Sequence, residues 1–374
     1  MYKSAASLKN KILLLLVLMG TVPLLMYGLF LKDTSTTEKE EHSSDYRFFL
    51  QGVSHQTADR VEESLSKKRN LLSAFAHTKS VVEAANIYMV TYDRLPSELA
   101  SNYSLQKVKV RVSDFYKGNA FYQGVNIDAR AWDDAGAFLQ FFYVVSSPNI
   151  KKSDQFNDSQ DPTGWTRVHK EHHEYLRKFA QASGFFNIMI VNNATGRVIY
   201  SSLKGPQLGA DLSRGPFNKL GFAKAFNKAK NIKQGDVYVR GVDETFLGGH
   251  KKSWAFATPI YKGDTPIATL VAEHEADIVD VGGVASFFHN AKPGIETDIY
   301  LINSDGEILS NITEFNGDVN PHSEGRLPHI TSEFKDKIAQ GVTSFQGQTR
   351  LSNSANAIVK SVDVNLAKPL YVVV

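Results

Sequence analysis

The chain has 374 residues, of which 42% are hydrophobic and 22% are charged, so it is long enough for two domains with sizeable cores. Its 42 basic and 39 acidic residues leave a net charge of +3, a balance that argues against nucleic acid or another strongly anionic partner. Cysteine is absent, which excludes disulfides, thiolate nucleophiles and cysteine metal sites.

An uncharged segment of twenty residues runs from Ile12 to Leu31. A helix of about twenty apolar residues spans the hydrocarbon layer of a membrane. Lys3, Lys9 and Lys11 precede it, which predicts a cytoplasmic N-terminus at residues 1–11. We therefore expect a helix in the inner membrane of a bacterium, with the bulk of the chain periplasmic. A cleaved signal peptide is the alternative, but its apolar core would be about 7 to 15 residues long and would end at a small-residue cleavage site.

The region that follows, residues 32–184, is predicted to be helical. Val61, Leu65, Leu72 and Phe75 recur at helical intervals, which predicts one long amphipathic stalk helix over residues 38–85. An amphipathic helix of this kind can pack on its own domain, and a stalk of this length can also pair with a second copy, so we expect a homodimer.

Further signals divide the rest of this helical region. Pro96 predicts a break at residues 94–97 and the start of another helix. Helices are also expected at residues 133–145 and 165–183, with a Ser-, Asn- and Asp-rich loop at residues 146–162 between them.

After Gly184 the pattern changes to strands. Residues 186–191 and 197–202 flank the turn Asn192 to Gly196, which predicts a hairpin. A helix at 217–230 and strands at 236–242, 253–261 and 267–273 follow, the last two joined by a turn at 262–265. We expect a mixed, mostly antiparallel sheet with helices beside it.

The same order of elements returns in shorter form. Strands are predicted at residues 298–302, 307–310, 357–364 and 369–374, with a helix at 332–340. The repetition predicts an α+β protein with two tandem modules, 185–290 and 291–374, joined by a helix at 276–290.

Three segments resemble the double-Cache, PAS-like extracytoplasmic sensor domains of bacterial chemoreceptors and other transmembrane signalling receptors. They are Phe185 to Leu212, Lys251 to Glu275 and Thr297 to Ser310, which are similar to the strand, Asn/Asp-Gly turn and strand of Cache modules and to their aromatic and Pro-Ile strand. The resemblance covers residues 38–374 and supports the fold more than the ligand.

The resemblance also implies a pocket for a small-molecule ligand in module 185–290. Its lining would comprise Arg214, Phe217, Tyr238, Arg240, Asp243, Trp254 and Phe256. Tyr238 and Arg240 share one strand face, as do Trp254 and Phe256 on their own strand. The Arg-x-Trp-Tyr core of amino-acid-binding members is absent, because Arg214 is followed by Gly-Pro-Phe. Ordinary packing or surface charge is the alternative for each residue.

Metal and catalytic sites are not indicated. His169 shares a helix face with either His172 or His173, but two imidazoles make a thin metal site, and a solvated helix face is the preferred interpretation. Asp133, Asp134, Glu273 and Glu275 are expected to be ordinary surface charges. Nucleotide-binding, nucleophile-elbow and zinc-protease motifs are absent, so we expect no enzyme activity and no cofactor.

These features predict the ligand-binding input domain of a transmembrane signalling receptor of the chemotaxis type or with another output. The distal module would bind a small solute, and the stalk would relay the change. The alternative is a membrane-tethered binding or scaffold protein of the cell envelope. A receptor should continue into a second membrane helix after Val374, so a truncated chain is expected.

Overall fold

The computed structural model describes residues 47–119, 131–244, 252–275, 299–304, 309, 332–341, 343–347, 355–362 and 370–373. The expected membrane helix at 12–31 and the joining helix at 276–290 lie outside them, as does the strand at 307–310 except for Leu309. Within the described ranges, none of the helices combines the length and the apolar character needed to cross a membrane. Contacts between Cα atoms divide the chain into residues 1–53 and 54–374.

The first long helix covers residues 47–76 and stops earlier than the sequence indicates. Helix α2, Lys79–Leu99, starts after Thr78, whose side chain accepts a hydrogen bond from the Val81 amide at 3.4 Å. The prediction of one uninterrupted helix to Ala85 is therefore wrong, because Thr78 caps a new helix. The predicted break at Pro96 is also wrong. Pro96 lies inside α2 one turn before its end, where its missing N–H removes one intrahelical hydrogen bond, and the burial of Leu95 and Leu99 offsets this loss.

The remaining helices surround the first sheet. They are α3 Leu105–Gly118, α4 Asp134–Gln140, the π-helical turn η3 Phe141–Val145, the 3-10 helix η4 Ile150–Gln155, α5 Gly164–Ala182 and α6 Gly221–Ala229. The predicted helices at 133–145 and 165–183 are confirmed, whereas α3 was not predicted. Helix α6 begins four residues later than predicted because residues 216–219 form a turn around buried Phe217.

Five antiparallel strands form the first sheet, in the order β2-β1-β5-β4-β3. Their bounds are β1 Asn187–Asn192, β2 Val198–Ser201, β3 Tyr238–Glu244, β4 Lys252–Lys262 and β5 Thr265–Glu275. Both predicted hairpins are confirmed. Gly196 and Gly263 occupy their turns at φ +70° and +59°, a conformation that residues with a Cβ rarely adopt.

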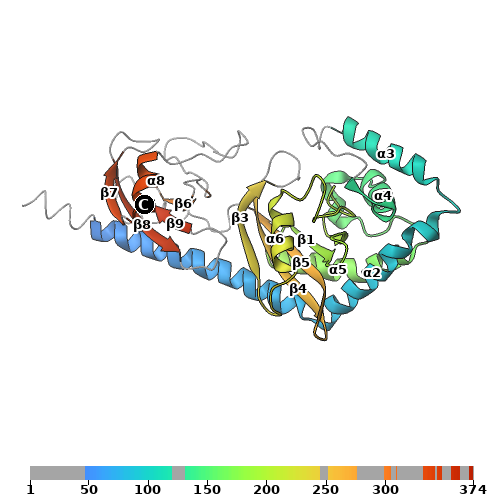
Figure 1. Ribbon diagram of the computed structural model, residues 1–374, viewed down its shortest axis with the longest axis horizontal. Helices are drawn as coiled ribbons and strands as arrows, with labels where there is room; N and C mark the ends of the chain where they lie inside the picture. Colours follow the sequence, from blue (N-terminus) through green and yellow to red (C-terminus); the bar gives the residue numbers. More distant parts are fainter. Residues whose placement is uncertain are drawn as a thin grey trace, which may run out of the picture. The chain divides into compact units, whose positions relative to one another are not determined.

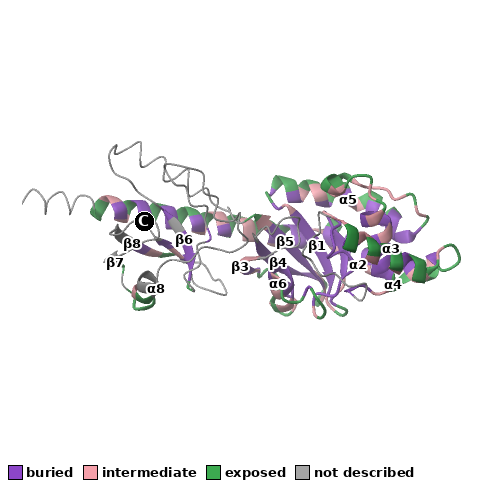
Figure 2. Ribbon diagram, turned by 90° about the horizontal axis from the view of Figure 1, so that it is seen from above, coloured by how far each residue is buried: buried purple, intermediate pink, exposed green. Residues whose placement is uncertain are grey.

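The two faces of this sheet are covered by different helices (Figure 1). On one face, the Phe256 ring lies 5.6 Å from that of Phe185 at the end of α5, and the Tyr200 ring lies 5.2 Å from that of Tyr88 on α2. We name it the α5 face. Helix α6 packs on β3, β4 and β5 from the opposite side, the α6 face. Figure 2 shows the strands as largely buried, as expected of a sheet covered on both sides.

A second antiparallel sheet has the order β6-β9-β8-β7. Its strands are β6 Tyr300–Asn303, β7 Ser344–Gly347, β8 Ala355–Val362 and β9 Leu370–Val373, and the accompanying helix is α8 Ser332–Ala339. Three strands and the helix match the predictions, and β7 is additional. Leu301, Ile302 and Val372 are buried, so this sheet has apolar packing of its own.

Helix α4 is held against the segment that follows β2. The fully buried Gln140 side chain donates to the Leu208 carbonyl at 2.7 Å and accepts from the Tyr116 hydroxyl at 2.5 Å. The Trp132 indole donates to the Pro206 carbonyl at 3.0 Å. Buried backbone carbonyls need hydrogen-bond donors. The Gln140 and Trp132 side chains supply donors to carbonyls of an irregular segment that do not pair within the sheet.

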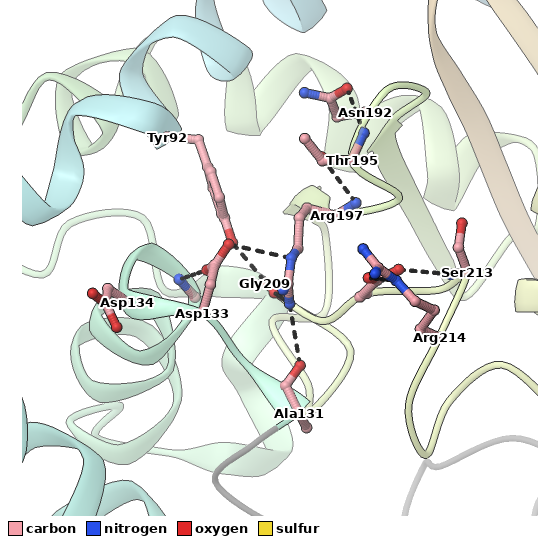
Figure 3. A network of polar contacts seen from close by, with 12 residues as sticks. Tyr92, Ala131, Asp133, Asp134, Asn192, Thr195, Arg197, Gly209, Ser213 and Arg214 are labelled. Atoms are coloured by element: carbon pink, nitrogen blue, oxygen red, sulfur yellow. Dashed lines mark hydrogen bonds and ion pairs between the residues drawn. The ribbon is translucent and has the colours of Figure 1, made fainter.

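Asp133 connects three segments that surround the first sheet or belong to it (Figure 3). Its Oδ1 accepts from the Gly136 amide at 2.8 Å, which caps α4, and from the Tyr92 hydroxyl at 2.7 Å. Its Oδ2 lies 3.2 Å from Nε of Arg197. One carboxylate thus links α4, α2 and the strand β2 region, and the prediction that it is an ordinary surface charge is wrong.

We expect Asp133→Ala to lower the free energy of unfolding by about 2 to 4 kcal/mol, since it removes a helix cap, the charge partner of Arg197 and one of the two acceptors of the Tyr92 hydroxyl. Asp133→Asn keeps the amide oxygen for the cap, so we expect a loss of only about 1 kcal/mol. Urea unfolding of the full chain measures both. Equal losses for the two variants would contradict this role of the cap.

Candidate functional site

Five polar side chains are buried together on the α6 face of the first sheet. The sheet-face cluster consists of Asn187, Ser201, Gln207, Ser253 and Glu273. The Asn187 amide donates to Glu273 at 2.9 Å and accepts from the Ser201 hydroxyl at 3.1 Å, and the Ser253 hydroxyl donates to Glu273 at 3.3 Å. Gln207 donates to Ser201 at 3.1 Å. These bonds join strands β1, β2, β4 and β5 with the segment after β2.

Glu273 is the ionisable member of this cluster, and only 1% of its surface is exposed. A carboxylate removed from water costs several kcal/mol unless partners satisfy it. The prediction that Glu273 is a surface charge is therefore wrong, whereas Glu275 is exposed as predicted. The burial of Glu273 could not be predicted from the local sequence, because strand β5 is buried on both faces and its alternation does not separate Glu273 from the apolar residues around it.

Three charged side chains form a second group at the edge of the same face, which we name the β3 edge group. Asp243 Oδ2 lies 2.9 Å from Lys224 Nζ and 3.3 Å from Arg240 Nη2. The register shifts between Arg240 and Asp243, and such a bulge brings both side chains to one face. Gly221 at the start of α6 permits the close approach, since a Cβ there would lie 2.7 Å from that of Asp243.

The strand register relates the edge group to the cluster. Arg240 pairs with Ala255, and Ala255 pairs with Glu273. Residues directly opposite each other on adjacent strands lie on the same face of the sheet, with their Cβ atoms about 5 Å apart. Arg240 and Glu273 therefore lie about 10 Å apart across Ala255, and Tyr238 lies beside Ala257 on the same face. The cationic Arg240 side chain and the anionic Glu273 side chain thus lie on either side of a strand that carries small residues on this face.

The seven residues proposed from the sequence do not line one surface. Tyr238, Arg240 and Asp243 lie together on the α6 face. Trp254 and Phe256 lie on the α5 face and are fully buried.

The other two of the seven lie apart from both groups. Phe217 is fully buried before α6. Arg214 is 83% exposed and pairs with Asp211 at 3.2 Å (Figure 3). Sequence reasoning missed Lys224, Asn187 and Glu273.

The histidines of α5 form a separate buried cluster, contrary to the predicted solvated face. His169 and His173 are fully buried, with ring centroids 4.4 Å apart. His169 also stacks on Trp165 at 4.9 Å. The face is buried because the loop before α5 and strand β2 cover it.

Lys204 reaches this cluster from the end of β2 and is 1% exposed. Its Nζ lies 2.9 Å from His173 Nε2 and from the Ser153 carbonyl oxygen. Burial lowers the pKa of Lys204 to about 7 and, with Lys204 nearby, that of His173 to about 3. Burial also holds the pKa of His169 well below its ordinary value. Both imidazoles are therefore neutral at physiological pH.

No metal centre is indicated in the described ranges, where groups of three or more His, Cys, Asp or Glu side chains suited to a metal ion do not occur. The imidazole atoms of His173 are occupied by Tyr200, Asp154 and Lys204. The buried histidines are therefore parts of a hydrogen-bond network.

No family model and no curated protein matches the chain. Solved structures are similar to the chain only at low identity and low TM-score. The extracellular domain of a protein described as a histidine kinase, rpHK1S-Z16, has a TM-score of 0.35 at 13% identity, over 54% of this chain and 75% of that one. The ligand-binding domain of the Pseudomonas fluorescens chemoreceptor CtaA with L-leucine has a TM-score of 0.31 at 11% identity, over 52% and 71%. The ligand-binding domain of the Pseudomonas aeruginosa PAO1 chemoreceptor PctB with L-Arg has a TM-score of 0.33 at 11% identity, over 75% of this chain and 94% of that one. The first is described as an extracellular domain and the other two as ligand-binding domains of chemoreceptors.

Proposed function

We propose that this chain is the extracytoplasmic sensing part of a transmembrane signalling receptor and that it binds a small solute on the α6 face of the first sheet. The observation that carries the proposal is the burial of a carboxylate and four other polar side chains on one sheet face. Buried polar groups in excess of what secondary structure needs are costly, and they are typical of a site that orients a ligand.

The proposed ligand lies between Glu273 and the β3 edge group. The Glu273 carboxylate suits an ammonium group, and Arg240 suits a carboxylate or another acceptor, because charge-assisted hydrogen bonds are the strongest available. Tyr238 is the proposed aromatic contact. Of the residues indicated by the resemblance, we retain Tyr238, Arg240 and Asp243 as contacts.

The remaining parts of the receptor proposal concern its assembly. We propose a membrane helix at 12–31, a homodimer paired along the helix at 47–76, and transmission of ligand closure through that helix. Ligand binding would shift the population between two arrangements of the helix by as much as the ligand distinguishes them.

The test is a thermal-shift screen of the full chain against amino acids, organic acids, amines and purines. A ligand at 100 times its dissociation constant stabilises by about 2.7 kcal/mol, which is readily measured. We expect a compound with an amine to raise the melting temperature. The absence of a shift with every class would favour the alternative of an envelope scaffold protein.

A compound found in this way is then titrated calorimetrically against two variants. Glu273→Gln keeps the size and a hydrogen-bonding oxygen but removes the charge, so we expect an affinity loss of about 10- to 100-fold for an amine ligand. Arg214→Gln is the control, because Arg214 is exposed and lies outside the proposed contacts. Equal affinity of Glu273→Gln and the unmodified chain would refute the site.

A further inference from the structure

The buried cluster around Lys204 lies outside the proposed ligand site. It joins three segments that are distant in the sequence: η4 and the residues after it, helix α5, and the end of β2. Lys204 adopts φ +52°, a strained conformation for a residue with a Cβ. The surrounding structure therefore holds this lysine in place.

The hydrogen bonds of His173 determine its tautomer. Its Nε2 lies 2.6 Å from the Asp154 carbonyl oxygen, and because a carbonyl only accepts, Nε2 carries the proton. Its Nδ1 lies 2.9 Å from the Tyr200 hydroxyl, so the hydroxyl donates to it. In this arrangement His173 donates to the backbone of η4.

The Lys204 amine faces the same nitrogen. Its Nζ donates to the Ser153 carbonyl at 2.9 Å and to that of Ser202 at 3.4 Å. A neutral amine has two N–H groups for these carbonyls, and its lone pair at 2.9 Å shares the single His173 Nε2 proton with the Asp154 carbonyl oxygen in a three-centre hydrogen bond. The neutral lysine and the Nε2–H imidazole are therefore compatible.

A protonated amine reverses this pattern. Its third N–H faces Nε2, which must then accept, so the imidazole carries its single proton on Nδ1 and donates to the Tyr200 hydroxyl. Nε2 and the Asp154 carbonyl oxygen are then two acceptors 2.6 Å apart, with no proton between them. The contact that holds η4 on α5 becomes repulsive.

The charged groups around Lys204 leave it open to titration. Asp154 is the facing carboxylate, but it is 3.7 Å from Arg177, whose charge opposes a second cation. Lys204 takes part in none of the described ion pairs. On α5, Glu174 also pairs with Arg177 at 2.9 Å. His169 and Tyr200 are kept neutral by burial, since the pKa of the first is lowered and that of the second is raised.

We propose that Lys204, His173 and Tyr200 form a proton-operated latch, which holds residues 150–155 on helix α5 while the Lys204 amine is neutral and releases them when this amine takes up a proton. The module would then respond to proton concentration independently of the solute at the α6 face. Burial lowers the pKa of Lys204 to about 7, which places the transition in the physiological range.

The test is hydrogen–deuterium exchange of the full chain between pH 5.5 and 8.5, corrected for the intrinsic pH dependence of exchange. We expect the amides of residues 150–157 to exchange about tenfold faster below the transition, because one hydrogen bond is lost there. Peptides from α6 serve as the internal reference and should not change.

Two variants separate the latch from a general effect of pH. Lys204→Met removes the titrating amine and should abolish the transition, whereas Lys178→Met, at a 70% exposed lysine of α5, should leave it intact. If Lys204→Met does not fold, ¹⁵N spectra of histidine-labelled unmodified chain decide, since the His173 proton must move from Nε2 to Nδ1 on acidification. A transition that persists in Lys204→Met, or a tautomer that does not change, would overturn the proposal.

Stability gives a further readout, with a defined sign. The folded pKa of Lys204 lies below its ordinary value of 10.5, so between about 7 and 10.5 the unfolded chain binds a proton that the folded chain does not. Stability should therefore rise with pH across this range. The denaturation midpoint of the unmodified chain should increase from pH 7 to pH 9, and this increase should be lost in Lys204→Met.

Discussion

Gly209→Ala is expected to lower the free energy of unfolding by about 2 to 5 kcal/mol. A Cβ at Gly209 would lie 2.4 Å from the Gly136 Cα atom, and Gly209 has φ +77°. The close contact is between two backbones, so no flexible side chain can move away. Overpacking costs about 1 to 3 kcal/mol, and a left-handed conformation with a Cβ costs about 1 to 2 kcal/mol more.

Gly215→Ala is the matched control for this substitution. Gly215 has φ +79° with nothing within 4 Å of the added Cβ, so only the conformational cost of about 1 to 2 kcal/mol applies. Urea unfolding of the full chain compares the two. Similar losses would show that the crossing of α4 with the segment after β2 can relax, contrary to the tight packing described above.

Trp254→Ala is expected to destabilise the chain by about 3 to 5 kcal/mol. The Trp254 side chain is fully buried on the α5 face, so its removal leaves a cavity in the core. Trp254→Phe should cost less, because the ring that remains fills part of the space. Urea or thermal unfolding measures both, and Val110→Ala on the 49% exposed Val110 should change stability by less than about 0.5 kcal/mol.

The Trp254→Phe variant also distinguishes a core residue from a ligand contact. If Trp254 packs only in the core, Trp254→Phe should bind a ligand of the α6 face with unchanged affinity. A variant with undiminished stability and lost ligand binding would instead place Trp254 at the site, as the family resemblance implied.

The hairpins of the first sheet were predictable because their turns carry local signals. The Asn192 to Gly196 turn and the turn around Gly263 need residues that tolerate positive φ, and the flanking strands are apolar. The helix breaks were less predictable. Thr78 and Pro96 each fit the local signal for the start of a helix. The burial of Leu95 and Leu99 on α2 favours continuation of that helix through Pro96.

The sequence by itself determined which residues share a face within one element. Alternation placed Tyr238 with Arg240 and Trp254 with Phe256, and helical spacing placed His169 with either His172 or His173. Each of these pairings follows from the geometry of a single strand or helix.

Only the tertiary structure decided which of these faces meet. The register of β3 on β4 places Trp254 and Phe256 on one face of the sheet and Arg240 on the opposite face. The burial of His169 depends on the loop before α5 and on strand β2, which pack over α5. Register and covering are set by contacts between segments far apart in the chain, which a local pattern does not contain. The buried Glu273 and the Lys204–His173 contact arise for the same reason.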